Sequence, residues 1–205
     1  MKKLLLLSLT LFLGVVVNAQ IEFKPGVKAG LNVTNFTNID DGPTEGKSIS
    51  SFHVGGVFGI KFVDFYTLQP ELLYTRQGSE IQGQLVIDDQ VFNETFKVEV
   101  NYISLHITNK FFVGGSGFNF QVAPVIDILV DSKNIDSPEG FDFAIAGGIG
   151  YNSPFGLTID LRYKQGLVDV FGRNVNTGDP IDNVEVGDLV LNKGFQLSFG
   201  YLFDL

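Results

Sequence analysis

The sequence predicts an all-β protein that folds as an eight-stranded antiparallel up-and-down transmembrane β-barrel. Three observations support this prediction. Apolar residues alternate with polar or small residues through most of the chain after residue 20, which is the pattern of strands with one apolar face. Short and long connections alternate between these segments. The residues that alternate with the bulky apolar ones include many glycines and alanines, as expected on the crowded inner face of a small barrel.

Length and composition agree with one folded unit. The chain has 205 residues, which corresponds to about one domain. A content of 44% hydrophobic and 18% charged residues argues against wholesale disorder. There is no cysteine, so disulfides, thiolate metal sites and cysteine nucleophiles are excluded. The 14 basic and 23 acidic residues give a net charge of −9, which argues against a nucleic-acid partner.

Residues 1–19 are predicted to be a signal peptide that is cleaved. Lys2 and Lys3 precede an apolar run over residues 4–17, and Ala19 supplies a small residue before the cut. The run is shorter than the ~20 residues that a helix needs to cross a bilayer. We therefore expect an exported chain in which residues 20–205 form one barrel domain. Without the two lysines that domain has 12 basic and 23 acidic residues.

The first four predicted strands alternate clearly. Over residues 27–34, Val, Ala, Leu and Val alternate with Lys, Gly, Asn and Thr. Over residues 52–62, Phe, Val and Ile alternate mainly with His, Gly and Lys. Over residues 68–75, Leu and Tyr alternate with Gln, Glu and Thr, and over residues 103–108, Ile and Leu alternate with Ser, His and Thr. Each segment therefore has one bulky apolar face and one polar or small face.

The last four predicted strands repeat the pattern. Residues 118–131 alternate Phe, Val and Ile with Asn, Gln, Ala and Asp. Residues 141–151 alternate Phe, Ile and Tyr with Asp, Ala and Gly. Residues 157–164 alternate Leu, Ile and Tyr with Thr, Asp, Arg and Lys, and residues 195–203 alternate Phe, Leu and Tyr with Gln, Ser and Gly. The strand count is therefore even, as an up-and-down barrel requires.

The connections predict which end of the barrel is which. Short, turn-like connections lie at residues 64–65, 113–117 and 153–156, and long polar connections lie at residues 37–50, 78–97, 131–140 and 172–187. Both termini fall on the side of the short connections. We therefore expect short periplasmic turns and long extracellular loops.

Two irregularities are expected in the strands. The connection 78–97 still alternates on both sides of Asp88-Asp89, which predicts a hairpin that continues past the main sheet. The apolar parity shifts between Val100 and Ile103, which predicts a bulge near Asn101. Pro70 and Pro124 each remove a ladder donor, so we expect them at bulges or where the missing N–H would point at a side chain.

Alternation alone leaves two orientations open. A soluble lipocalin-like carrier hides its apolar face, whereas an outer-membrane barrel shows that face to lipid. Small residues on the polar face favour the membrane reading; they are Gly55, Gly59, Ala144, Ala146, Gly148 and Gly150. Aromatic residues at predicted strand ends also favour it, because they suit interfacial girdles; they are Phe65, Tyr66, Tyr151, Phe155, Tyr163, Tyr201 and Phe203.

The polar face also carries charges of both signs, which we predict to form a charge network inside the barrel. Three acids can there pair with three bases, since an unpaired buried ion costs several kcal/mol. Eight strands leave an interior just wide enough for side chains to fill, so we expect a plug and no stable large pore. The predicted members are Lys61, Glu71, Asp127, Asp160, Arg162 and Lys164.

The chain resembles a known family over its whole length after the signal peptide. The motifs that carry the resemblance are GVKAGLN at 26–32, LQPELLY at 68–74, GLTIDLRY at 156–163 and a phenylalanine-rich final strand. These motifs are similar to those of the small outer-membrane β-barrel proteins of the PorT-like, "porin family" type of Bacteroidetes. The resemblance implies the outer membrane and, as for some relatives, contact with envelope partners or secretion machinery. One departure is that Asp204-Leu205 follow Phe203 at the end of the chain.

The functional prediction is a structural or loop-mediated binding role, without enzyme activity. Ser104 and His106 share a strand face and, with Glu71, permit a lipid-hydrolase alternative, but no G-x-S-x-G elbow accompanies them. We predict no catalytic, cofactor-binding or metal-binding residues and no cofactor. The expected partners are outer-membrane lipid and an extracellular ligand or envelope protein, and a monomer is favoured. The binding segments would be loops 37–50, 78–97 and 172–187.

Overall fold

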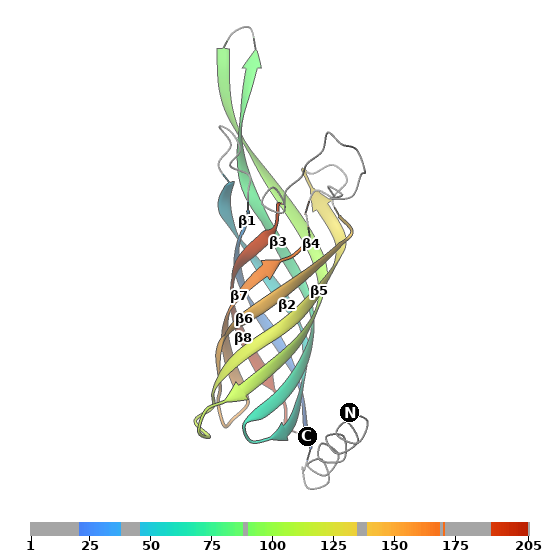
Figure 1. Ribbon diagram of the computed structural model, residues 1–205, viewed down its shortest axis with the longest axis vertical. Coiled ribbons are helices and arrows are strands. Elements are labelled where there is room, and N and C mark those ends of the chain that lie inside the picture. Colours follow the sequence, from blue (N-terminus) through green and yellow to red (C-terminus); the bar gives the residue numbers. More distant parts are fainter. Residues whose placement is uncertain are drawn as a thin grey trace, which may run out of the picture.

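The computed structural model describes residues 21–37, 46–87, 90–134, 139–168, 170 and 190–204. Eight antiparallel strands pair in sequence order, and β1 also pairs with β8, so that the sheet closes into a barrel (Figure 1). No helix among these residues is long and apolar enough to cross a bilayer. The strands are β1 (Glu22–Phe36), β2 (Gly46–Val63), β3 (Tyr66–Ile87), β4 (Gln90–Phe112), β5 (Phe118–Lys133), β6 (Phe141–Asn152), β7 (Leu157–Gly166) and β8 (Asn192–Leu202).

The predicted fold class and all eight strands are confirmed. Most strands are longer than the alternating segments, because polar residues continue the ladders beyond the apolar stretch. The short connections gather at one end of the barrel, and the end of β8 and the start of β1 lie there too (Figure 1). Two of these turns require glycine, since Gly117 and Gly156 have φ values of 82° and 92°. The other end carries the longer connections.

The hairpin predicted over residues 78–97 is confirmed. β3 and β4 stay paired from Tyr66↔Phe111 to Ile87↔Gln90 and rise beyond the rest of the barrel (Figure 1). On one side, the pairing of β3 with β2 ends at Gly46↔Ile81. On the other side, the pairing of β4 with β5 ends at Glu99↔Lys133. The segment is therefore a two-stranded ribbon above its neighbours.

A register shift beside Asn101 confirms the predicted irregularity, but the extra residue is on the neighbouring strand: Asn101 pairs with Asp131 and Tyr102 with Leu129, which leaves Val130 of β5 unpaired in the β4–β5 ladder. Of the two arrangements expected for Pro70 and Pro124, the bulge is contradicted for both. Pro70 falls in a gap of the β2–β3 ladder, and Pro124 falls in a gap of the β4–β5 ladder, while the register continues unchanged across each gap. Each proline therefore lies where one ladder is interrupted, as its missing N–H requires.

The orientation predicted for the membrane reading is confirmed, since bulky apolar side chains point outward. Exposed residues occur on every strand, among them Leu31, Leu72, Ile128, Ile149 and Phe199. Aromatic side chains crowd the end with the short turns, where Phe65 and Phe155 are 63% and 64% exposed. Others pair there across strands, namely Phe23–Phe58, Tyr66–Phe111 and Phe118–Tyr151, and Tyr201 contacts Phe203 at the end of β8. This girdle suits a membrane–water interface.

Candidate functional site

The barrel interior is lined by buried polar and charged side chains, with small residues between them. Ala144 and Ala146 on β6 are buried, and Gly148 and Gly150 follow them on the same inward face. A Cβ atom on Gly150 would collide with the side chains of Gln121 and Asp160. The small residues predicted for this face therefore leave the volume that long polar side chains from other strands fill.

Glu71 on β3 is the centre of one group of buried ion pairs. Its carboxylate accepts two bonds from Arg162 on β7, Nη1 to Oε2 at 2.9 Å and Nη2 to Oε1 at 2.7 Å. Lys28 Nζ on β1 donates to Glu71 Oε1 at 2.8 Å. Gln69 and Thr108 donate to the same oxygen at 2.8 and 3.0 Å. Charge-assisted bonds from several strands thus satisfy this buried carboxylate.

Asp160 on β7 is the second centre and shares partners with the first. Lys28 Nζ lies 2.7 Å from Asp160 Oδ2, and Lys110 Nζ lies 3.3 Å from Oδ1. Gln121 Nε2 donates to Oδ1 at 2.5 Å, and Gln121 Oε1 accepts from Arg162 Nε at 2.6 Å. Two carboxylates and three cations therefore form one connected network across the middle of the barrel.

A further ion pair lies nearer the end with the long connections. Lys164 on β7 donates to Asp127 on β5 and to Gln77 Oε1 on β3, the latter at 3.3 Å. Asn192 Nδ2 on β8 donates to the same Gln77 oxygen at 2.8 Å. Asp142, which faces Asp127 across β5 and β6, is also buried. Among the described residues, the interior therefore holds four inward-facing carboxylates and four Lys or Arg side chains. They are Glu71, Asp127, Asp142 and Asp160, and Lys28, Lys110, Arg162 and Lys164.

The structure brings five of the six sequence-predicted network residues into the interior; they are Glu71, Asp127, Asp160, Arg162 and Lys164. Lys61 is the exception and corrects the prediction. It lies at the short-turn end, where its side chain is 42% exposed and pairs with Asp64 at 2.8 Å. The hydrogen bond from Lys61 lowers the pKa of the Asp64 carboxyl below its ordinary value. Lys61 therefore has a partner in the turn and does not reach the network.

Two essential members, Lys28 and Lys110, were missing from the prediction. Lys28 alternates with Val27 and Ala29 within a predicted strand, so its inward direction was readable from parity. Lys110 lies beyond the predicted strand 103–108, because Asn109 interrupts the apolar alternation there. Asp142 also has the inward parity and was missing from the predicted network. Applying parity to every residue would have found Lys28 and Asp142, and extending the strand 103–108 to its turn would have found Lys110.

The residues of the hydrolase alternative do not form a catalytic arrangement. Ser104 and His106 are completely buried on the inner face of β4. Ser104 Oγ and both ring nitrogens of His106 have no hydrogen-bond partner among the described residues. A serine nucleophile requires a bonded base and an oriented carboxylate, so the geometry does not favour this alternative.

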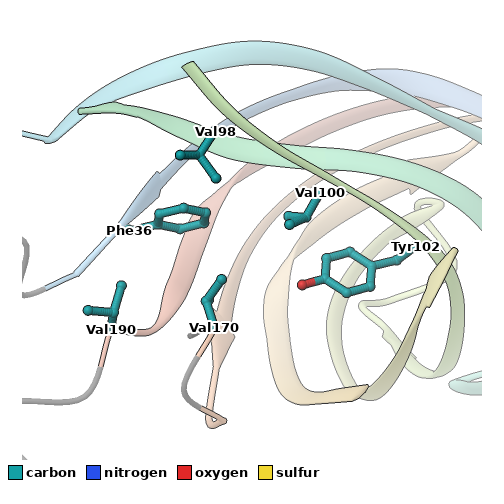
Figure 2. Packing of buried hydrophobic residues seen from close by; sticks show 6 residues of the cluster. All are labelled: Phe36, Val98, Val100, Tyr102, Val170 and Val190. Atoms are coloured by element: carbon teal, nitrogen blue, oxygen red, sulfur yellow. The ribbon is translucent and has the colours of Figure 1, made fainter. Parts of the chain in front are cut away.

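An apolar cap, defined here as Phe36, Val98, Val100, Tyr102, Val170 and Val190, lies inside the end with the long connections (Figure 2). Its members come from β1, β4 and the segment between β7 and β8. Backbone bonds hold that segment in place, because Val170 N–H donates to Val190 O at 2.9 Å and Thr37 N–H donates to Leu191 O at 2.8 Å. The cap therefore covers the polar interior on this side.

The opposite end is hollow. A cavity of about 530 Å³ opens among the short turns. Its lining includes both ion-paired lysines of this end, Lys24 and Lys61, together with Thr67 and Thr158. Lys24 pairs with Glu22 at 3.0 Å and with Asp204 at 2.7 Å. Among the described residues, no group of three or more His, Cys, Asp or Glu side chains is placed to hold a metal ion.

A closed antiparallel barrel with an apolar exterior, an aromatic girdle and a polar interior defines the class of outer-membrane β-barrel proteins. The same architecture excludes the lipocalin-like arrangement, in which the apolar face would be inside. The model of the family "Outer membrane protein beta-barrel domain" matches residues 18–172, and the chain belongs to this family.

Two solved structures, with TM-scores of 0.51 and 0.50, share this fold, and a third is similar at a lower score. Neisserial surface protein A is 11% identical to this chain, with a TM-score of 0.51. The match covers 87% of this chain and 97% of that protein. The attachment invasion locus protein Ail of Yersinia pestis is 14% identical with a TM-score of 0.50, covering 89% and 99%. OprG of Pseudomonas aeruginosa is 11% identical with a TM-score of 0.46, covering 91% and 97%. A comparison with curated proteins finds no match.

Some predicted segments lie outside the described residues. These are the signal peptide 1–19, most of loop 37–50 and the whole of loop 172–187. Of the three predicted binding segments, only 78–97 is largely described, and it is the β3–β4 ribbon.

Proposed function

We propose that this protein is a surface recognition protein of the outer membrane, in which the barrel is a rigid anchor and the β3–β4 ribbon makes the contact. The observation that carries this proposal is the ribbon itself. Beyond Ile81 on β3 and Glu99 on β4, the two strands pair only with each other among the described strands, so the outer edge of each is free. Free strand edges offer rows of N–H and C=O groups, which commonly pair with an extended segment of a partner.

The charge distribution supports an outward-facing role. The four segments at the far end of the barrel, 37–50, 78–97, 131–140 and 167–191, contain 15 acidic and 4 basic residues. The rest of the chain after residue 20 contains 8 acidic and 8 basic residues. The whole excess of negative charge therefore belongs to the outward connections, and its field favours a cationic partner over a polyanionic one.

The interior supports a second part of the proposal, that no stable large pore crosses the barrel. Arg162 and Lys164 reach across the interior from β7 to acids on β3 and β5. Both are nearly inaccessible, as are their partners. A filled eight-stranded barrel has little room for a channel. Enzyme activity is not part of the proposed function.

Three finer proposals complete the picture. Residues 1–19 are removed on export, so that the mature chain begins at Gln20, which N-terminal sequencing of the membrane-extracted protein tests. The motifs at 26–32, 68–74 and 156–163 support membership of the PorT-like type. We propose a monomer, because the sheet closes within one chain through the pairing of β1 with β8.

The recognition proposal is tested by cross-linking in intact cells. A photo-reactive amino acid at Thr95, which is exposed on the ribbon, is expected to give a discrete adduct of higher mass. The matched control carries the same group at Gly115 in a short turn at the other end. A variant in which residues 82–95 are replaced by an Asn-Gly turn is expected to keep its heat-modifiable mobility and lose the partner. Co-purification of the same partner with that variant would contradict the proposal.

A further inference from the structure

Three buried side chains form a row near the outer end of the barrel. Ser104 on β4 lies opposite Asp127 on β5, and Asp127 lies opposite Asp142 on β6. Ser104 and Asp127 are fully inaccessible, and Asp142 is 3% exposed. Directly opposite residues of antiparallel strands share a face, with Cβ atoms about 5 Å apart. The row therefore brings one hydroxyl and two carboxylates together on the inner wall.

Each member of the row has an oxygen without a hydrogen-bond partner among the described residues. These atoms are Ser104 Oγ, Asp127 Oδ1 and Asp142 Oδ2. The other carboxylate oxygen of each aspartate is engaged. Asp127 Oδ2 accepts from Lys164 Nζ, and Asp142 Oδ1 accepts from Val168 N–H at 3.3 Å. A buried oxygen without a partner is costly. Three such oxygens in one row indicate a bound cation, which accepts electron pairs from them.

The charges in the row identify the kind of acceptor. Two carboxylates face one ammonium group, that of Lys164. The other three interior cations, Lys28, Lys110 and Arg162, are bound to Glu71 and Asp160. The row thus has one excess negative charge, and the network of Glu71 and Asp160 has one excess positive charge. A monovalent ion makes the row itself neutral, whereas a divalent ion would leave it with an excess positive charge beside Lys164, and hard cations choose oxygen ligands such as these.

The surroundings of the row isolate it from water. On its outer side, Tyr102 of the apolar cap lies two residues from Ser104 on β4 (Figure 2). On its inner side, the next residues along the three strands are His106, Val125 and Ala144, and all three are completely buried. An ion between these buried layers interacts strongly with the carboxylates, because the local dielectric constant is low.

We propose that Ser104, Asp127 and Asp142 bind one monovalent cation of the size of Na⁺, with its hydration shell largely replaced by their oxygens. The bound ion joins β4, β5 and β6 close to the register shift at Val130 of β5. The proposed role of this ion is structural, and ion transport is not part of the proposal. Ionisable residues at membrane depth commonly mark such sites.

The test is a stability titration of the purified mature barrel folded in a nonionic detergent. The midpoint of thermal unfolding, followed by heat-modifiable gel mobility, is measured in increasing NaCl, with choline chloride keeping the ionic strength constant. A ligand that binds only the folded state raises the midpoint with concentration. We expect a saturable rise for the native chain, no rise for Asp142→Asn and a weaker dependence for Ser104→Ala. Asp64→Asn, which alters an exposed turn carboxylate, is the matched control and keeps the native response.

Two results would overturn the proposal. One is a native midpoint that is the same in NaCl and in choline chloride, which would mean that water alone satisfies the row. The other is an unchanged Na⁺ response in Ser104→Ala together with Asp142→Asn. Should Asp142→Asn fail to fold, Ser104→Ala decides the question, because removing an unbonded hydroxyl leaves every hydrogen bond of the described residues intact.

Discussion

Glu71 and Arg162 form a two-bonded carboxylate–guanidinium pair that spans the barrel from β3 to β7, with N···O distances of 2.9 and 2.7 Å. The two strands are not neighbours in the sheet. The pair therefore acts as a cross-brace, and both groups have side-chain exposures of 2% or less. Such a pair holds the wall in shape only while both partners are present.

Glu71→Gln is expected to destabilise the barrel strongly. The variant leaves the Arg162 charge buried beside a neutral amide and removes a partner of Lys28 as well. Loss of one member of a buried ion pair costs about 3–5 kcal/mol. Urea titration of the detergent-folded protein measures the free energy of unfolding. The control is Asp64→Asn, which breaks an exposed pair with Lys61 and is expected to change little. Equal stability of the two variants would contradict the cross-brace.

Gly150→Ala is expected to destabilise the barrel by overpacking. The added Cβ would meet the side chains of Gln121 and Asp160 in the middle of the network. Overpacking of this kind costs about 1–3 kcal/mol. Gly56→Ala is the matched control, because its Cβ would lie 4.0 Å from the nearest atom. The same urea titration compares them, and a destabilisation no greater than that of Gly56→Ala would show that the interior is looser than described.

Spin labels are expected to report lipid on the outer face. The chain has no cysteine, so single cysteines at Leu161, Phe58 or Ile126 can be labelled without background. Leu161 is outward on β7, and a label there should be accessible to oxygen and shielded from a water-soluble nickel reagent. A label at Asp64, in an exposed turn, should behave in the opposite way. Water access at Leu161 would reverse the assignment of the two faces.

Planar-bilayer recordings are expected to show no steady large single-channel currents from the pure native protein. The reason is that long charged side chains fill the interior and the apolar cap closes its outer end. The double variant Glu71→Ala, Arg162→Ala removes the largest pair from the plug and is expected to increase the leak. Steady large currents from the native chain would refute the plug.

The fold was predictable because its signals are local. Alternation over residues 157–164, for example, predicts both the strand and which of its residues face inward. The shift in apolar parity before Ile103 pointed to the region of the bulge. The proline positions were only partly predictable, because a ladder gap depends on the register of the neighbouring strand. Pro70 and Pro124 read alike in the sequence as possible bulges, yet each interrupts only one of its two ladders.

The interior was less predictable than the wall. Parity places Lys28 inside, but the choice of its partners depends on how far the strands are staggered around the barrel. The apolar cap was not predicted, because Val98 and Val100 continue the inward parity of Ser104 and His106 on β4, where the sequence analysis expected polar residues. Phe36 and Val190 join them from distant parts of the chain. Only the closed register brings these residues together.

The unequal strand lengths make the outer rim stepped. β3 and β4 continue for several residues past the point where β2 and β5 stop. At about 3.3 Å per residue, the six β3 residues 82–87 correspond to roughly 20 Å of strand beyond the last pair with β2. In the proposed function, a partner that pairs with this ribbon is therefore held to one side of the barrel axis and beyond the ends of β2 and β5.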